Sequence, residues 1–97
     1  MSTLSLDTIV VASRDQVAAD LDSEVIILGL TDGIYYGVDG VAARIWALVQ
    51  QPVRLHEIVR AVHAEFDVDE AVCQSDVLAF VDELARRGLV TRVGDGP

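Results

Sequence analysis

Two histidines and one cysteine are the side chains in this sequence most suited to metal binding or nucleophilic chemistry. His56 and His63 fall about two turns apart on one predicted helix, roughly 10 Å by helical rise, which is too far for both to ligate one metal ion. Cys73 is the single cysteine, so the chain alone forms no disulfide and no multi-cysteine metal site. We expect surface histidines, a half-buried thiol and no metal.

The carboxylates and glycines do not point to catalysis either. Asp76, Asp82 and Glu83 fit the solvated face of an acidic helix, although an acidic rim can also attract a basic ligand. The glycines between positions 29 and 40 are spread over strands and turns, and no Lys-Ser/Thr pair follows them, so they do not form a phosphate-binding loop. Because no nucleophile stands with a base and an orienting group, we expect a non-enzymatic protein without a cofactor.

Charge and hydropathy narrow the class of protein further. Sixteen acidic residues against seven arginines give a net charge of −9, which opposes binding to nucleic acid and to anionic membranes. The most apolar stretch, Val25 to Leu30, is far shorter than the roughly 18 residues of a membrane span. Met1 to Asp7 lacks the residue order of a secretory signal. We expect a cytoplasmic protein that partners neither nucleic acid nor membrane.

Apolar runs and turn residues predict a three-stranded antiparallel meander. Gln16 to Leu21 and Glu24 to Leu30 are separated by Asp22 and Ser23, the spacing of a two-residue hairpin. Asp32 and Gly33 then suit a turn before a third strand over Ile34 to Val38. The first dozen residues have no clear period, so we interpret them as a mobile arm or a loosely attached strand.

Three helices are predicted after the strands. The first runs from about Val41 to Val49 with Asp39 as its N-cap, and the second from about Leu55 to Phe66. The third runs from near Asp69, a good cap, to Arg87, where Gly88 stops it. A short strand over Leu89 to Val93 ends the pattern. We therefore expect one α+β domain over residues 1–97, winged-helix-like, with its core between about residues 16 and 93.

The predicted third strand is a possible sheet edge. Backbone groups on such an edge are a template for an incoming strand, and a neighbouring helix can supply side-chain pockets. From the pattern alone, an ordinary edge strand, protected by Gly37 and by its shortness, is the favoured interpretation. A DNA-binding winged-helix regulator and a subunit that pairs with its own copy are further alternatives, although the third helix is acidic.

Four segments of the sequence resemble the PqqD-like family over about residues 16 to 93. They are residues 32–40 (DGIYYGVDG), 43–48 (ARIWAL), 55–59 (LHEIV) and 80–90 (FVDELARRGLV). The family shows a tyrosine-bearing strand, an Ile-Trp helix, a Leu/Val-x-Glu-Ile/Leu helix start and a closing Gly-Leu-hydrophobic signature. Asp39 departs from the asparagine that the family often has, and the capping chemistry stays the same.

The resemblance implies a peptide chaperone that recognises ribosomally made precursor peptides. In this family a leader peptide adds as an antiparallel strand to the third strand, and its side chains enter a groove beside the third helix. The chain is most similar to the discrete recognition proteins of lasso-peptide biosynthesis, which present the precursor to a leader peptidase and then to a cyclase. The cofactor-pathway member, which partners a radical enzyme, has the same fold and stays open as an alternative.

Carried over residue by residue, the resemblance implies two sets of peptide-binding positions. In the strand they are Ile34, Tyr35, Tyr36, Gly37 and Val38, with Tyr36 and Val38 partly committed to the core by alternation. In the helix they are Cys73, Asp76, Val77, Phe80, Val81 and Leu84, of which Val77 and Leu84 are the most inclined to be core. Arg86 and Arg87 either neutralise an acidic leader segment or favour the helix C-terminus.

Overall fold

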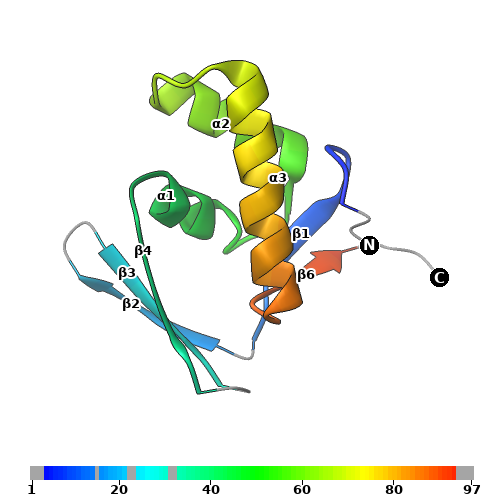
Figure 1. Cartoon of the computed structure of the whole chain (residues 1–97). Helices are drawn as coiled ribbons and strands as arrows, with labels where there is room; N and C mark the ends of the chain where they lie inside the picture. The colour runs from blue at the N-terminus through cyan, green and yellow to red at the C-terminus, as the bar shows by residue number, and fades with distance from the viewer. Residues whose placement is uncertain (1–3, 15, 22–23, 31–32, 94–97) are drawn as a thin grey trace.

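The computed structural model describes residues 4–14, 16–21, 24–30 and 33–93, which form six strands and three helices (Figure 1). The elements in chain order are β1 (Ile9–Ala12), β2 (Gln16–Leu21), β3 (Glu24–Gly29), β4 (Tyr35–Asp39), α1 (Gly40–Leu48), β5 (Val53–Arg54), α2 (Leu55–Glu65), α3 (Glu70–Arg86) and β6 (Val90–Val93). The predicted α+β class is confirmed, as is the order of three antiparallel strands followed by three helices.

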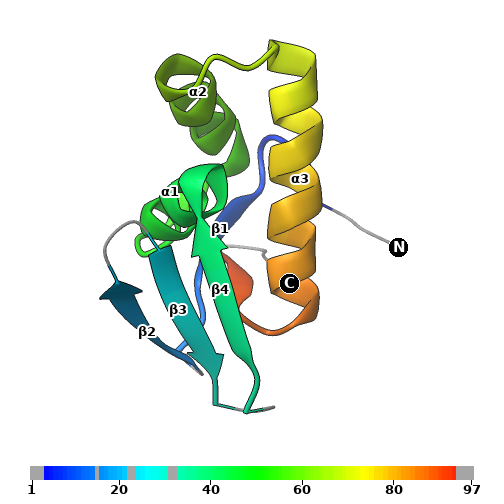
Figure 2. The same ribbon diagram turned by 60° about the vertical axis from the view of Figure 1, so that its left-hand side comes forward.

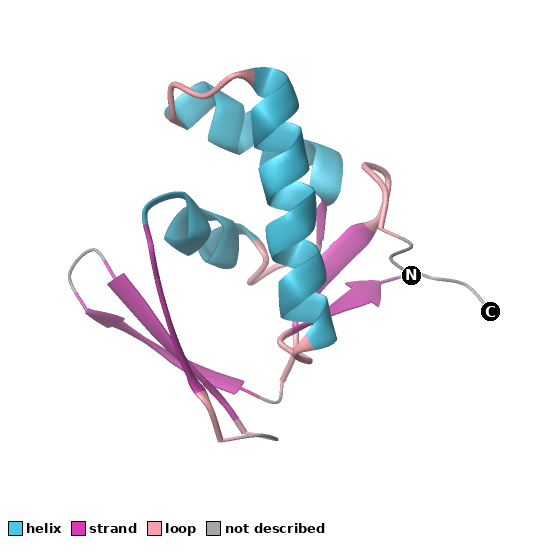
Figure 3. Cartoon of the chain, in the orientation of Figure 1, coloured by secondary structure: helices cyan, strands magenta, loops and turns pink. Residues whose placement is uncertain are grey.

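The strands β2, β3 and β4 form an antiparallel meander in that order. Leu21 pairs with Glu24, so the register of the first hairpin agrees with the predicted two-residue connection. Residues 22–23 and 31–32, on which the turn predictions rest, lie outside the described residues. The helices gather on one side of this sheet, which leaves it an inner and an outer face (Figure 3).

Cross-strand partners share a face of the sheet. Ile27 pairs with Tyr36 and Val25 with Val38, and all four side chains belong to the core or pack against it. These pairs therefore mark the inner face. Between them, by alternation, lie the outer-face residues of β3 and β4.

The interpretation of the first dozen residues as a mobile arm or loose strand is wrong for the part that the structure describes. β1 is the central strand of a second antiparallel sheet, in the order β5-β1-β6. Val10 is 0% exposed, and the backbone carbonyls of Leu6 and Thr8 accept hydrogen bonds from the N–H groups of His56 and Leu55, both at 2.9 Å. β1 is fixed in the fold by its backbone pairing with β5 from the middle of the chain and with β6 from its end.

Local chemistry explains where α3 begins and ends. The Asp69 side chain accepts hydrogen bonds from the backbone N–H groups of Ala71 at 3.1 Å and Val72 at 3.4 Å, as its prediction as a cap requires. Gly88 follows the helix with φ 75°, a left-handed conformation that glycine adopts at least cost. Asp39 occupies the N-cap position of α1, but its side chain makes no capping hydrogen bond.

One hydrophobic core joins both sheets and all three helices. Trp46, the single tryptophan, is buried in it. Outside the core, Arg44 of α1 forms an ion pair with Glu65 of α2 at 2.8 Å. The buried members are Val10, Ile27, Ile45, Trp46, Val49, Leu55, Ile58, Val59, Val62, Cys73, Val77, Val81, Leu84, Leu89 and Val90. None of the helices described is long and apolar enough to cross a membrane.

Candidate functional site

The strand β4 lies at an edge of the meander, with β3 as its one strand neighbour among the described residues. Figure 2 shows β4 on the side of the sheet that is nearest α3, while β2 forms the far edge. The predicted position of this strand at a sheet edge is therefore confirmed. The edge runs beside the longest helix of the fold, and the two elements frame the candidate site.

The hydrogen-bond pattern tells which backbone groups of β4 face the edge. The N–H of Gly29 donates to the carbonyl of Ile34 at 3.0 Å, and the β3–β4 register makes these two residues opposite partners. In an antiparallel ladder hydrogen-bonded pairs alternate with non-hydrogen-bonded ones. Ile34, Tyr36 and Val38 thus direct their backbone groups toward β3. The N–H and C=O of Tyr35 and Gly37 point the other way, toward the open edge.

Side chains of β4 alternate between the two faces of the sheet. Tyr36 and Val38 are half-buried and pack against the core, which confirms their predicted commitment to it. Tyr35 points to the outer face and is 70% exposed, and Ile34, just before the strand, is 47% exposed. The inner-face side chains of the edge strand are therefore packed against the core, and its outer face presents the exposed ring of Tyr35.

A contact between α3 and β4 identifies the flank of the helix that faces the edge strand. A guanidinium N–H of Arg87 donates to the hydroxyl of Tyr36 at 3.4 Å, and the guanidinium lies 5.1 Å from the centre of that ring. Glu83, Phe80 and Asp76 precede Arg87 by four, seven and eleven residues, the spacing of one helix face. Two of the predicted groove residues, Asp76 and Phe80, thus lie on the flank that faces β4.

Charges at the C-terminal end of this flank are paired. Glu83 accepts hydrogen bonds from Arg87 at 2.6 Å and from Arg86 at 2.8 Å, and the hydrogen bond from Arg87 is the main reason that the pKa of Glu83 is lowered. The hydrogen bond to Tyr36, followed by that to Glu83, raises the pKa of Arg87. The ion pair with Glu83 positions the Arg87 guanidinium over the Tyr36 ring, and the Arg87–Tyr36 contact connects the C-terminal end of α3 to the edge strand.

A hollow of about 90 Å³ lies at the other end of the site, beside the junction of β4 and α1. Its lining is largely apolar and comes from α1, α2, the loop after α2 and the first half of α3. The lining residues are Val41, Val62, Val68, Cys73, Asp76 and Val77. Cys73, Asp76 and Val77 were predicted from the sequence, whereas the other three were not. Val41 and Val62 have the apolar spacing of core positions on their helices, and nothing in the loop around Val68 pointed to a site.

The predicted helix residues differ in burial. Cys73, Val77, Val81 and Leu84 are core members in the free chain, whereas Phe80 is half-buried and Asp76 is exposed. Burial, followed by the nearby Asp76 and Glu70 carboxylates, raises the pKa of the Cys73 thiol, which donates to the carbonyl of Val59 at 3.7 Å. The thiol therefore stays protonated and contributes as a small apolar group.

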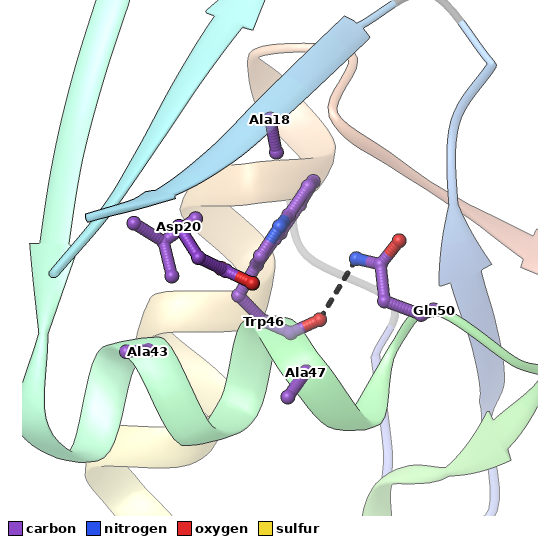
Figure 4. A pocket seen from close by; sticks show the side chains of 7 residues that line it. Ala18, Asp20, Ala43, Trp46, Ala47 and Gln50 are labelled. Carbon is purple, nitrogen blue, oxygen red and sulfur yellow. Dashed lines mark hydrogen bonds between the residues drawn. The ribbon is translucent and has the colours of Figure 1, made fainter. Parts of the chain in front are cut away.

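A larger hollow, about 300 Å³, lies away from the edge strand (Figure 4). It opens between β2, β3 and α1 around the ring of Trp46, with Asp20 and Gln50 as polar members of its lining. The Gln50 amide donates to the carbonyl of Trp46 at 2.9 Å. None of its lining residues belongs to β4 or α3, so its greater size does not make it part of the candidate site.

Neither histidine joins the site. Nδ1 of His63 lies 3.0 Å from the carbonyl oxygen of Val68, and His56 is exposed at the start of α2. Within the described ranges, no three His, Cys, Asp or Glu side chains gather in a way that would hold a metal ion.

Comparisons with known proteins find one matching family and two solved structures with a similar fold. The family described as Coenzyme PQQ synthesis protein D (PqqD) matches residues 24–90. The solved structure of TbiB1 in complex with the TbiA(beta) leader peptide is 37% identical to this chain and has a TM-score of 0.77. The match covers 90% of this chain and 99% of the TbiB1 chain. A second solved structure, lasso peptide synthetase B1 complexed with the leader peptide, is 18% identical and has a TM-score of 0.75. It shares the fold over 84% of this chain and 96% of the synthetase B1 chain. No curated protein sequence matches. With both its β4–α3 site region and most of its length matched, the chain belongs to the PqqD family.

Proposed function

We propose that this chain binds the leader segment of a ribosomally made precursor peptide by adding it as a strand to β4. The observation that carries the proposal is the edge of β4, where the backbone groups of Tyr35 and Gly37 face outward beside the flank of α3. Main-chain pairing supplies affinity in such strand addition, and pockets for alternate side chains supply specificity. TbiB1, which is 37% identical, has been solved with a leader peptide.

Side-chain recognition falls to the flank of α3 and to the small hollow. Asp76 and Phe80 face the path of the added strand, and the hollow next to Val41 and Val77 offers an apolar recess at its end. Cys73, Val77, Val81 and Leu84 support this wall from the core. Ile34 and the β4 residues Tyr35, Tyr36, Gly37 and Val38 form the opposite side of the proposed site.

The chain acts as a carrier rather than a catalyst in this proposal. It holds the precursor in the cytoplasm for a leader peptidase and then for a cyclase, as the likeness to lasso-peptide proteins suggests. A transcriptional regulator is not supported, because the net charge of −9 opposes DNA binding. A subunit that pairs β4 with its own copy is not supported by the comparisons either.

The experiment is a titration of the protein into a fluorescently labelled TbiA(beta) leader peptide, the leader with which the 37% identical TbiB1 was solved. Fluorescence polarisation should show saturable binding to this peptide. Phe80→Ala should weaken it about fivefold or more, as is common when a buried interface aromatic is lost. Leu78→Ala is the matched control, because Leu78 is also half-buried on α3 but lies on the opposite flank.

Two outcomes would count against the proposal. Absence of binding by a folded sample to this leader peptide would leave the family likeness as a statement about fold alone. Equal losses in Phe80→Ala and Leu78→Ala would place recognition away from the flank that faces β4.

A further inference from the structure

The hollow around Trp46 lies between the inner face of β2 and the helix α1, away from the leader site. Asp20 of β2 pairs with Val25, which packs against the core, so Asp20 occupies an inner-face position that alternation reserves for apolar residues. Small side chains make up much of the wall. The alanines that line the hollow are Ala18, Ala43 and Ala47. Its volume of about 300 Å³ is that of a small ligand pocket.

The indole N–H of Trp46 is a hydrogen-bond donor that the fold leaves unpaired. Trp46 is 3% exposed, yet no described residue accepts a hydrogen bond from its ring nitrogen. A buried indole usually donates to a partner. No side-chain nitrogen or oxygen in the described part of the chain is both sealed from solvent and unpaired, so the ring nitrogen opens into the hollow. Figure 4 shows the ring lying among the side chains of Ala18, Asp20 and Gln50. A ligand atom that accepts a hydrogen bond would complete this site.

The wall opposite the indole carries a negative charge. Asp20 is exposed and forms no ion pair with any residue that the structure describes, and no arginine or histidine lines the hollow. Glu24 and Asp39, also exposed, lie on the outer face at this same end of the meander. The summed potential at the mouth therefore favours a positively charged group.

We propose that this hollow binds the amino-terminal residue of a peptide. The α-ammonium group pairs with Asp20, and the first peptide carbonyl accepts the hydrogen bond of the Trp46 indole N–H. A neutral amide lacks the charge that Asp20 attracts. A free amino acid adds a carboxylate that Asp20 and the net charge of −9 repel. A peptide amino terminus supplies the acceptor and the positive charge together, and its small side chain lies against the alanine wall.

Two sources could supply this terminus. One is the bound leader itself, a point that rests on the proposed function. An antiparallel strand added to β4 has its amino end beside Asp39, which is the end of the meander where Asp20 lies. The other source is a separate peptide that is bound independently of the leader.

The test follows the indole N–H signal of Trp46 by NMR during a titration with alanyl-alanine amide. The sequence has one tryptophan, so this signal reports on the hollow alone. At about pH 6.5 the α-amine of the probe is protonated. We expect a saturable shift of the signal with a Kd of about 1 mM, a value within reach of so small a ligand. The N-acetylated probe, which has no charge, should bind about fivefold more weakly or less tightly still.

Two variants test the two walls of the hollow. Asp20→Asn should weaken probe binding about fivefold, whereas Glu24→Gln, on an exposed carboxylate outside the hollow, should leave it within about twofold. Ala47→Leu fills the hollow with a strong helix former and should abolish the shift. Ala64→Leu is its matched control, because Ala64 is an exposed helix residue that does not line the hollow. Native dispersion of the amide spectrum shows that each variant is folded.

The TbiA(beta) leader with a free or an acetylated amino terminus distinguishes the two sources. A loss of leader affinity on acetylation that disappears in Asp20→Asn would assign the bound terminus to the leader. Unchanged probe affinity in the leader-saturated protein would assign the hollow to a separate peptide.

No saturable shift at a probe concentration about fifty times the expected Kd would overturn the inference, and the hollow would then hold only water. Equal affinities of the free and acetylated probes, or of the native chain and Asp20→Asn, would overturn it as well. Because the probe is titrated without a leader, failure of the native chain to bind the leader would refute the proposed function alone.

Discussion

Replacing Gly37 by proline should weaken leader binding while leaving the fold in place. The N–H of Gly37 points away from β3, because the hydrogen-bonded pairs of the β3–β4 ladder fall at Ile34, Tyr36 and Val38. Proline therefore removes no ladder hydrogen bond at this position, and edge strands tolerate it. It does remove the donor that an added strand would use, and its ring fills the space through which the strand approaches.

The magnitude follows from the hydrogen bonds at stake. An antiparallel partner opposite Gly37 would exchange two backbone hydrogen bonds with it. Each contributes a net of about 0.5–1.5 kcal/mol, so their loss costs about 1–3 kcal/mol, or about five- to 150-fold in Kd. Fluorescence polarisation with a labelled leader measures the change directly. A urea titration followed by the buried Trp46 reports whether the variant is folded.

Gly37→Ala separates the effect of the missing donor from that of an added Cβ. A Cβ at this position would lie 3.1 Å from Oε2 of Glu24, the mobile end of a flexible side chain, and 3.6 Å from Cδ1 of Ile26. The alanine variant keeps the N–H, so it should bind the leader within about threefold of the native affinity. This loss is smaller than the roughly fivefold or more expected when both backbone hydrogen bonds opposite Gly37 are lost. A folded Gly37→Pro variant that binds as tightly as Gly37→Ala would refute strand addition at β4.

Three further predictions concern the fold and its ionisable groups. Val10→Ala should lower the free energy of unfolding by about 2 kcal/mol, from two lost methyl-sized groups and the cavity they leave, whereas Thr91→Ala on the exposed surface of β6 should change it by under about 0.5 kcal/mol; equal urea midpoints would show that β1 is not part of the core. Cys73 should react with a disulfide reagent at pH 8 only as the protein unfolds, because burial raises the pKa of its thiol, and rapid labelling of the native protein would contradict this. Since the folded pKa of Glu83 is lowered from its ordinary 4.5, its stabilising effect is present above that pH and is lost as the pH falls through the lowered value; thermal unfolding between pH 6 and pH 3 should therefore show a smaller acid loss in Glu83→Gln than in the native chain, and identical losses would contradict the Arg87–Glu83 linkage.

Much of the fold could be predicted because its signals are local. The β2–β3 hairpin follows from alternating apolar runs with a short polar break, and α3 follows from the Asp69 cap and the Gly88 stop. β1 and β5 could not be predicted in this way. Residues 9–12 carry no period that tells buried from exposed, and β5 has only two residues. Their pairing is set by contacts far apart in the chain, such as Val10 with Val53 and Arg92.

The candidate site was predictable in part for the same reason. Strand alternation was enough to assign Tyr36 and Val38 to the core, and the family likeness supplied β4 and α3 as the elements of the site. The flank of α3 that faces β4 required the Arg87–Tyr36 contact, which joins residues 51 positions apart. A broad apolar helix does not tell Phe80 on that flank from Leu78 on the other. Val68 lines the hollow from a loop, where no periodicity exists to reveal it.

Amide hydrogen exchange of β4 tests the central claim most directly. NMR spectra recorded with and without saturating leader peptide would follow each N–H of the strand. Strand addition predicts that the N–H groups of Tyr35 and Gly37 gain strong protection, while those of Tyr36 and Val38, already directed at β3, change much less. Unchanged exchange at Tyr35 and Gly37 in a saturated complex, or new protection along β2 instead, would contradict leader binding at the β4 edge.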